Sequence, residues 1–241
     1  MRHSSKSDRK ACPGQVERKP ARIRGAQTEA KQMNPARKKR RLIRDAIRDA
    51  ALREFARNGL AGTSTQAIAD AAGISKAQLH YYISSKEDLY QEALGYILSE
   101  WREIFFLSSS RDDPETAIRT YIERKIRHGL EHPDSLRLFA KEMARGAPEM
   151  GEHWPGLQAA VDEASAVIQV WIDDGKIAAV DPLLFQINMW AVTQHYAEYE
   201  AQTRTLMKAG PNGPLDADRI VDEAIQLFLT RCGLAQPGEK E

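Results

Sequence analysis

The segment IADAAGISKAQLHYY, residues 68–82, limits the possible folds of this chain more than any other stretch. It places Gly73 between two short runs in which small and apolar residues recur every three or four positions. That spacing predicts one buried face on each of two short helices, and a glycine gives the backbone the freedom for a tight turn between them. The sequence therefore predicts a helix-turn-helix. The inward residues are expected to be Ala67, Ile68, Ala71, Leu79 and Tyr82.

A longer amphipathic helix is expected before this motif, starting near Pro35 and ending at Gly59, which suits a left-handed helix cap. Thr63 or Ser64 would then be the N-cap of the first helix of the motif. Ser75 would be the N-cap of the second helix.

The second helix of the motif carries polar and aromatic side chains opposite its apolar face. Because small residues let the two helices cross closely, we expect this helix to protrude and to enter the major groove of DNA. Glutamine can pair with adenine through two hydrogen bonds, and lysine can bind guanine or phosphate. Hydroxyl, amide and lysine groups beside it would contact phosphates. The alternative is an ordinary helical hairpin with a solvated polar face. The candidate DNA-binding residues are Thr63, Thr65, Gln66, Ser75, Lys76, Gln78, His80, Tyr81 and Lys86.

Positive charge is concentrated at the start of the chain. Residues 1–62 hold 18 of the 35 Lys and Arg residues but only 6 of the 34 Asp and Glu residues, although the net charge of all 241 residues is +1. This asymmetry indicates a polyanionic partner such as double-stranded DNA. Residues 1–36 contain Pro and Gly without periodicity, which predicts a disordered basic leader. The leader is either merely solvated or adds phosphate contacts that do not read base sequence.

The remaining chain shows helical periodicity and no alternating strand pattern, which predicts an all-α fold. The last two helices are expected at about 182–206 and 216–232. The two cysteines, Cys12 and Cys232, form no metal or redox pattern, so we expect a reducing, cytoplasmic location and no cofactor. Since there is no run of about 18 apolar residues, no membrane span is expected.

The segment HGLEH, from His128 to His132, offers an alternative function as a metal-dependent hydrolase. It fits the H-x-x-E-H pattern, in which two histidines on a helix hold zinc. Pro133 ends the helix at the second histidine, no third ligand stands out, and Glu131 resembles ordinary surface charge. We therefore expect no metal site and no enzyme activity.

A ligand pocket is predicted at MWAVTQHYAEY, where Trp190 and Gln194 are four residues apart and share a helix face. Tryptophan offers a flat surface to a planar ring. Glutamine offers a donor and an acceptor to the imide edge of a pyrimidine. The alternative is a packing tryptophan beside a glutamine whose amide is satisfied by water or backbone.

The segment GTSTQAIADAAGISKAQLHYYISSKEDLY resembles the DNA-binding domain of the TetR family of bacterial transcriptional regulators. The resemblance covers roughly residues 37–92. Two positions depart from the family pattern: His80 replaces a common tyrosine that contacts phosphate, and Ile83 replaces a common core phenylalanine.

Residues 101–200 resemble the ligand-binding half of the regulators of pyrimidine utilisation, a branch of that family. The resemblance implies that uracil or thymine is the effector and that Trp190 and Gln194 contact it. Lys141 and Arg145 stand where that branch has apolar or small residues, a change that would alter the pocket wall.

Together these features predict a homodimeric, ligand-responsive regulator, most simply a repressor that binds a palindromic operator. The domains are expected to be the leader 1–36, a DNA-binding domain 37–84, and a ligand-binding and dimerisation domain 85–235. The last two helices would form the dimer interface by burying Ile220, Leu227 and Phe228. The region of Trp101 and Phe105 is expected to link the pocket to the DNA-binding domain.

Overall fold

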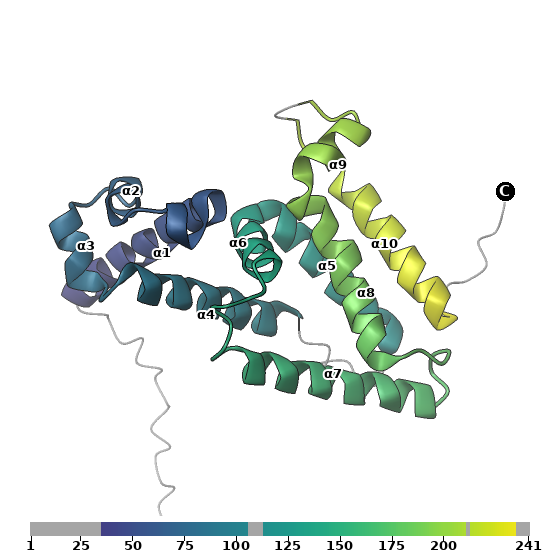
Figure 1. Ribbon diagram of the computed structural model, residues 1–241. Helices are drawn as coiled ribbons and strands as arrows, with labels where there is room; N and C mark the ends of the chain where they lie inside the picture. Colours follow the sequence, from purple (N-terminus) through teal and green to yellow (C-terminus); the bar gives the residue numbers. More distant parts are fainter. Residues whose placement is uncertain (1–34, 106–112, 211–212, 235–241) are drawn as a thin grey trace, which may run out of the picture.

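Every regular element in the described part of the chain is a helix, as predicted. The computed structural model describes residues 35–105, 113–210 and 213–234. The predicted leader therefore lies outside the described residues, apart from its last two positions, which begin the first helix. The side chain of Phe105 also lies outside them. Figure 1 shows the N-terminal helices at one end of the molecule and a larger bundle at the other, with α4 and α6 between them.

The first helix, α1 (Pro35–Gly62), is interrupted where the sequence predicted its end. Gly59 has φ 68° and ψ 177°, so the regular helix stops there, although helical turns resume as far as Gly62. A non-glycine residue would be strained in this conformation.

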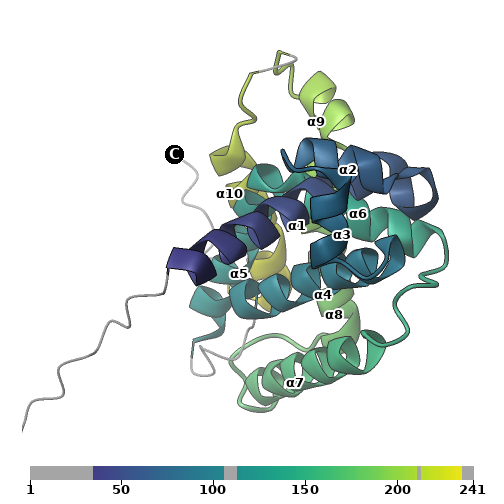
Figure 2. The same cartoon turned by 90° about the vertical axis from the view of Figure 1, so that its left-hand side faces the viewer.

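The helix-turn-helix is formed by α2 (Thr65–Ala71) and α3 (Lys76–Tyr82), which gather with α1 and α4 at the end of the molecule that faces the viewer in Figure 2. The side-chain oxygens of Ser64 and Ser75 each accept a hydrogen bond from a backbone N–H three residues later, at 3.1 Å. Ser64 is thus the N-cap of α2, one of the two residues proposed from the sequence.

The core beneath this motif extends well beyond it. α4 (Lys86–Phe105) adds Leu89, Tyr90 and Leu94, and the Tyr90 ring packs edge-on against Phe55 with 4.9 Å between ring centroids. Ile68 and Ala69 are the buried residues of α2, whereas Ala71, predicted to face inward, is exposed.

The second half is a bundle centred on three helices: α5 (Pro114–Glu131), α8 (Pro182–Glu198) and α10 (Ala217–Cys232). α7 (Trp154–Asp173) packs along α8, and α6 (Pro133–Ala144) lies between α8 and α1. The single helix predicted at 182–206 is wrong. Tyr199, with φ −106° and ψ 41°, separates α8 from a short α9 (Glu200–Leu206).

The predicted interface residues of α10 divide into two groups. Ile220 and Phe228 are 4% and 5% exposed and belong to the core of their own chain, so their assignment to a dimer interface is wrong. Leu227, next to Phe228 in sequence, points the other way and is 56% exposed. In a helix, neighbouring residues differ in direction by about 100°, so one position decides between core and surface. No helix in the described ranges is both long enough and apolar enough to cross a membrane.

Candidate functional site

The outer side of α3 presents the four residues predicted to enter a DNA groove. Leu79 anchors the helix in the core and Tyr82 is half-buried, while four other polar and aromatic positions are exposed. Gly73, with φ 68°, permits the turn, and the amide of Ile74 donates to the carbonyl of Ala69 at 3.0 Å. A short helix fixed in this way holds its outward side chains in a defined direction. The exposed residues are Lys76, Gln78, His80 and Tyr81.

Three further candidates lie beside α3 at the starts of the two helices. Ser75 is exposed and uses its hydroxyl to cap α3. Thr65 is half-buried at the first position of α2, and Gln66 is exposed. The Gln66 amide nitrogen donates to Asp70 Oδ1 at 2.8 Å, which holds the side chain against its own helix.

Thr63 and Lys86 have internal partners that the sequence did not indicate. The Thr63 side chain is 3% exposed, and its hydroxyl donates to the carbonyl oxygens of Glu54 and Gly59 at 3.1 and 2.8 Å. Lys86 Nζ donates to the carbonyl oxygens of Leu60 and Thr63 at 2.8 and 3.0 Å. Both side chains hold the connection between α1 and α2. Because Thr63 is buried, the prediction that it contacts a phosphate is wrong. Lys86 has a structural role in this conformation.

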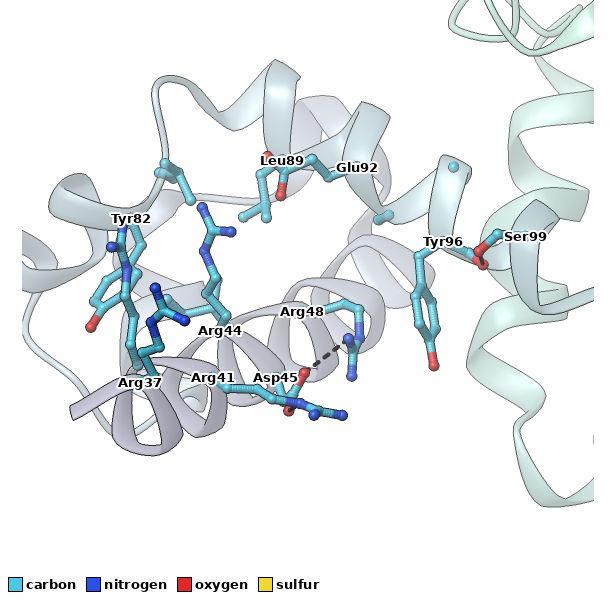
Figure 3. A pocket seen from close by; sticks show the side chains of 15 residues that line it. Arg37, Arg41, Arg44, Asp45, Arg48, Tyr82, Leu89, Glu92, Tyr96 and Ser99 are labelled. Atoms are coloured by element: carbon cyan, nitrogen blue, oxygen red, sulfur yellow. Dashed lines mark hydrogen bonds and ion pairs between the residues drawn. The ribbon is translucent and has the colours of Figure 1, made fainter. Parts of the chain in front are cut away.

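An arginine-lined groove lies along α1 and was missed from the sequence. We call this hollow of about 770 Å³ between α1, the end of α3 and α4 the arginine groove. Figure 3 shows Arg37, Arg44 and Tyr82 at one end of it, and Arg48, Tyr96 and Ser99 at the other. The sequence signal for it is the run RKKRR, residues 37–41, which by itself indicates only positive charge. The arginines that line the groove are Arg37, Arg40, Arg41, Arg44 and Arg48.

The arginines at the two ends of the groove differ in how firmly they are held. The Arg48 guanidinium donates to Asp45 at 3.1 Å and lies 4.2 Å from the centroid of the Tyr96 ring, an arrangement that fixes it. Arg37 and Arg44 are exposed at the end of the groove beside α3. The groove therefore has a fixed wall near α4 and positive charge near the helix-turn-helix.

The second cavity lies between α4, α5, α6, α7 and α8 and encloses about 660 Å³. Trp190 and Gln194 both line it, as does Trp101, which is predicted to connect the pocket with the DNA-binding part. Trp101 packs edge-on against Phe139 at 4.9 Å between centroids. We call this cavity the aromatic pocket. Its aromatic lining is Trp101, Tyr121, Phe139, Trp154 and Trp190.

Lys125 of α5 lines the aromatic pocket and was not singled out from the sequence. It is 5% exposed, and its Nζ lies 5.6 Å from the ring centroids of both Trp101 and Trp190 and 5.7 Å from that of Tyr121. Its Nζ is 3.5 Å from the Tyr121 hydroxyl, which also pairs with Trp190. Burial lowers the pKa of Lys125 to about 7, although the negative charge of Glu198 opposes the shift.

The buried glutamine with a hydrogen-bonded amide, which the sequence alternative expected at Gln194, is Gln186. Gln186 is 3% exposed, and its nitrogen donates to Ser165 Oγ at 2.8 Å and to the Pro182 carbonyl at 3.0 Å. Gln194, two turns later on α8, is half-buried at the cavity wall. Lys141 and Arg145, expected to alter the pocket wall, are not among its lining residues. Lys141 instead donates to the carbonyl of Arg57 on α1 at 2.6 Å.

Glu142 joins the two halves of the molecule through hydrogen bonds. It is fully buried on α6, where Oε2 accepts from the Tyr90 hydroxyl at 2.9 Å and Oε1 accepts from the amide of Glu149 at 2.7 Å. Burial, followed by the contact with this carboxylate, raises the pKa of Tyr90 above its ordinary value. The adjacent Phe139 and Met143 line the aromatic pocket, so α6 contacts both the pocket and the core under α3.

The HGLEH segment does not form a metal centre in the described residues. His128 lies in the last turn of α5, and His132 links α5 to α6. Their rings are 4.8 Å apart, and His128 Nε2 is 3.5 Å from Glu100 Oε2. Across the residues with assigned positions, no group of three or more His, Cys, Asp or Glu could hold a metal ion.

Comparison with known proteins identifies both halves of the chain. Residues 47–93 match the model of bacterial regulatory proteins of the tetR family, and residues 94–235 match that of the C-terminal region of YcdC-like proteins. The HTH-type transcriptional regulator RutR of Escherichia coli K12 is 38% identical over 76% of this chain and 87% of its own length. The HTH-type transcriptional repressor SCO4008 of Streptomyces coelicolor is 30% identical over 61% of this chain and 76% of its own.

The fold has matches among solved structures. The crystal structure of SCO4942 of Streptomyces coelicolor has a TM-score of 0.64 at 20% identity, and the match covers 80% of this chain and 99% of that one. The sequence relatives are transcriptional regulators rather than enzymes, so the hydrolase alternative for HGLEH has no support. This chain, with its helix-turn-helix and its second helical domain, belongs to the TetR family of bacterial transcriptional regulators.

Proposed function

We propose that this protein is a homodimeric repressor that binds a palindromic operator and leaves it when uracil or thymine occupies the aromatic pocket. The observation that carries the proposal is the position of α4. Its first turns belong to the core beneath α3, and its last turns line the aromatic pocket with Trp101. A ligand that changes the packing at Trp101 can therefore change the position of α3.

DNA recognition is proposed for the exposed side of α3. Gln78 would read a base edge in the major groove, with Lys76, His80 and Tyr81 beside it. Thr65 and Gln66 at the start of α2 would contact phosphates. The exposed arginines of the arginine groove adjoin the end of α3 at Tyr82, so they would contact the flanking phosphates. A cytoplasmic location follows, because the operator lies on the bacterial chromosome.

A pyrimidine effector is supported by the chemistry of the aromatic pocket. Its volume of about 660 Å³ lies within the range of roughly 300–1,000 Å³ that is usual for small-molecule sites. The indole of Trp190 provides a flat wall, and Gln194, one turn further along α8, provides a donor and an acceptor. The branch resemblance assigns the same two residues to the effector, and the curated relative RutR matches over most of its length.

The homodimer is proposed to form through the outer faces of α8 and α10. Leu184 on α8 and Leu227 on α10 are 54% and 56% exposed, so each leaves apolar surface on the outer face of its helix. Pairing of these faces about a two-fold axis gives a self-complementary interface. Two copies of α3 would then contact operator half-sites spaced by roughly 34–36 Å or a little more.

The proposal is tested with an operator selected from random duplexes by the full-length protein. Fluorescence anisotropy then measures release by uracil, thymine and cytosine. Uracil or thymine should release the DNA, whereas cytosine should not, because an amino group replaces one of the carbonyl groups at its edge. Equal release by all three, or by none, would contradict the pyrimidine effector. Failure to select any operator would contradict DNA binding itself.

A further inference from the structure

The aromatic pocket contains a charged anchor that neither the branch resemblance nor the comparisons assign. Lys125 is a buried basic group of the cavity wall, at 5% exposure, and it comes from α5, whereas Trp190 and Gln194 come from α8. Its amine lies among three aromatic rings at 5.6–5.7 Å from their centroids. A ligand that stacks on either indole would therefore lie close to this amine.

The surroundings keep the Lys125 amine at the cavity wall. Nζ lies 5.6 Å from the ring centroid of Trp190 on α8, and the Tyr121 hydroxyl, one turn earlier on α5, lies 3.5 Å from Nζ. That hydroxyl also pairs with Trp190, so the amine, the phenol and the indole form one connected polar group in an apolar cavity. Such a group is held in place before a ligand arrives, which reduces the ordering cost of binding.

We infer that Lys125, in its protonated form, donates a hydrogen bond to an exocyclic oxygen of the effector. The ligand class is thereby narrowed to planar heterocycles with an oxygen acceptor, and anionic oxygens are preferred to neutral ones. The inference rests on the proposed function, since it places Lys125 opposite the edge of the pyrimidine that Gln194 does not pair with. A charge-assisted hydrogen bond in a low-dielectric site is stronger than a neutral one.

Binding should then be coupled to proton uptake. Because the pKa of Lys125 is about 7 without ligand, roughly half of the amines are neutral at pH 7 and about a tenth are charged at pH 8. If the charged form alone binds, affinity should fall about tenfold between pH 6 and pH 8. Other ionisable groups face the same region: Tyr121 on α5, Glu198 on α8, Arg102 on α4, and Glu152 and His153 before α7.

Two variants distinguish the effect of the Lys125 amine on binding from the effect of removing any positive charge from α5. Lys125→Met keeps the unbranched side chain to within one atom of its length and removes the amine. Arg124→Met removes a charge from the exposed neighbouring position on the same helix. Thermal melting of both variants without ligand shows that they are folded. The probes are uracil and barbiturate, a trioxopyrimidine that is an anion at neutral pH.

Isothermal titration calorimetry at pH 6, 7 and 8, in buffers of different ionisation enthalpy, decides the question. The wild type and Arg124→Met should bind barbiturate more tightly than uracil, take up protons with uracil, and lose affinity for uracil as pH rises. Lys125→Met should bind both ligands at least tenfold more weakly and without pH dependence. Unchanged uracil affinity in Lys125→Met would overturn the inference and leave the pyrimidine proposal standing. Failure of the wild type to bind either probe would overturn both.

Discussion

The arginine groove and the aromatic pocket enclose similar volumes, about 770 and 660 Å³, and α4 forms a wall of both, yet their chemistry is opposite. The groove has its charges at an exposed rim, where guanidinium groups stay hydrated and can exchange counterions for phosphates. The pocket has aromatic walls and a buried amine. A charge at a hydrated rim attracts any polyanion, whereas a charge in an aromatic cavity selects a ligand of matching shape. Size alone therefore says little about what either hollow binds.

Among the variants, Gln194→Leu is expected to show the largest difference between its effect on ligand affinity and its effect on DNA affinity. The variant keeps roughly the side-chain volume and leaves the imide edge of a pyrimidine without its partner, at a cost of about 1–3 kcal/mol, or five- to 150-fold in affinity. Calorimetry with uracil should show this loss, while operator affinity without ligand stays unchanged. Gln202→Leu, at an exposed position of α9, is the control and should alter neither. Normal release of operator by uracil in Gln194→Leu would contradict the assigned role.

An effect of similar size, on DNA rather than on ligand binding, is expected from Gln78→Ala on α3. If Gln78 pairs with a base, specific operator binding should weaken by about 1–3 kcal/mol, while binding to unrelated duplexes stays nearly intact. Anisotropy titrations on both kinds of duplex measure the ratio of operator affinity to the affinity for unrelated DNA. An unchanged operator preference would show that α3 is oriented differently in the groove.

The arginine groove should respond differently, through salt dependence rather than specificity. Removing Arg37, Arg41 and Arg44 together should weaken binding to all duplexes alike. It should also reduce the slope of log affinity against log salt by roughly 0.9 for each phosphate that is no longer neutralised. Arg53→Ala, at an exposed position of α1 outside the groove, is the control. If the triple variant instead changed uracil affinity, the two hollows would not be chemically independent.

A separate prediction concerns the contribution of Lys125 to stability. Its pKa is lowered from 10.5 to about 7 in the folded protein, so between these pH values the unfolded chain binds more protons. The contribution of Lys125 to the free energy of unfolding therefore rises with pH across that window. Melting curves should show Lys125→Met more stable than the wild type at pH 7, with the difference shrinking towards pH 9.5. A difference independent of pH would show that the amine is not desolvated.

Local sequence signals predicted the helix-turn-helix because each of them acts within a few residues. Ser75 caps α3 through its own side chain, and Gly59 and Gly73 adopt the positive φ that their neighbours could not. Thr63 and Lys86 could not be assigned in the same way. Their partners are carbonyl groups 4 to 26 residues away, exposed by the break at Gly59, and a polar residue beside a DNA-binding helix is otherwise expected to contact DNA.

The sequence predicted lining residues of the aromatic pocket on α8 but not Lys125 on α5. Trp190 and Gln194 share a face of α8, so their spacing was sufficient to predict that both line the same cavity. Lys125 lies in the run ERKIRH, where nothing distinguishes it from Arg124, which is exposed. Only the packing of α4 and α8 against α5 determines that one of these adjacent cations is buried.

The position of α6 has a consequence for how the chain unfolds. Leu138 on α6 and Met150 after it belong to the same core as Phe55 and Ile68, and Glu142 binds the Tyr90 hydroxyl. The helix-turn-helix thus completes its core with residues more than fifty positions further along the chain. A fragment that ends at residue 84 would expose that core, and the two halves should melt in one cooperative transition. Occupying the pocket should therefore slow amide hydrogen exchange in α2 and α3 as well as in the bundle.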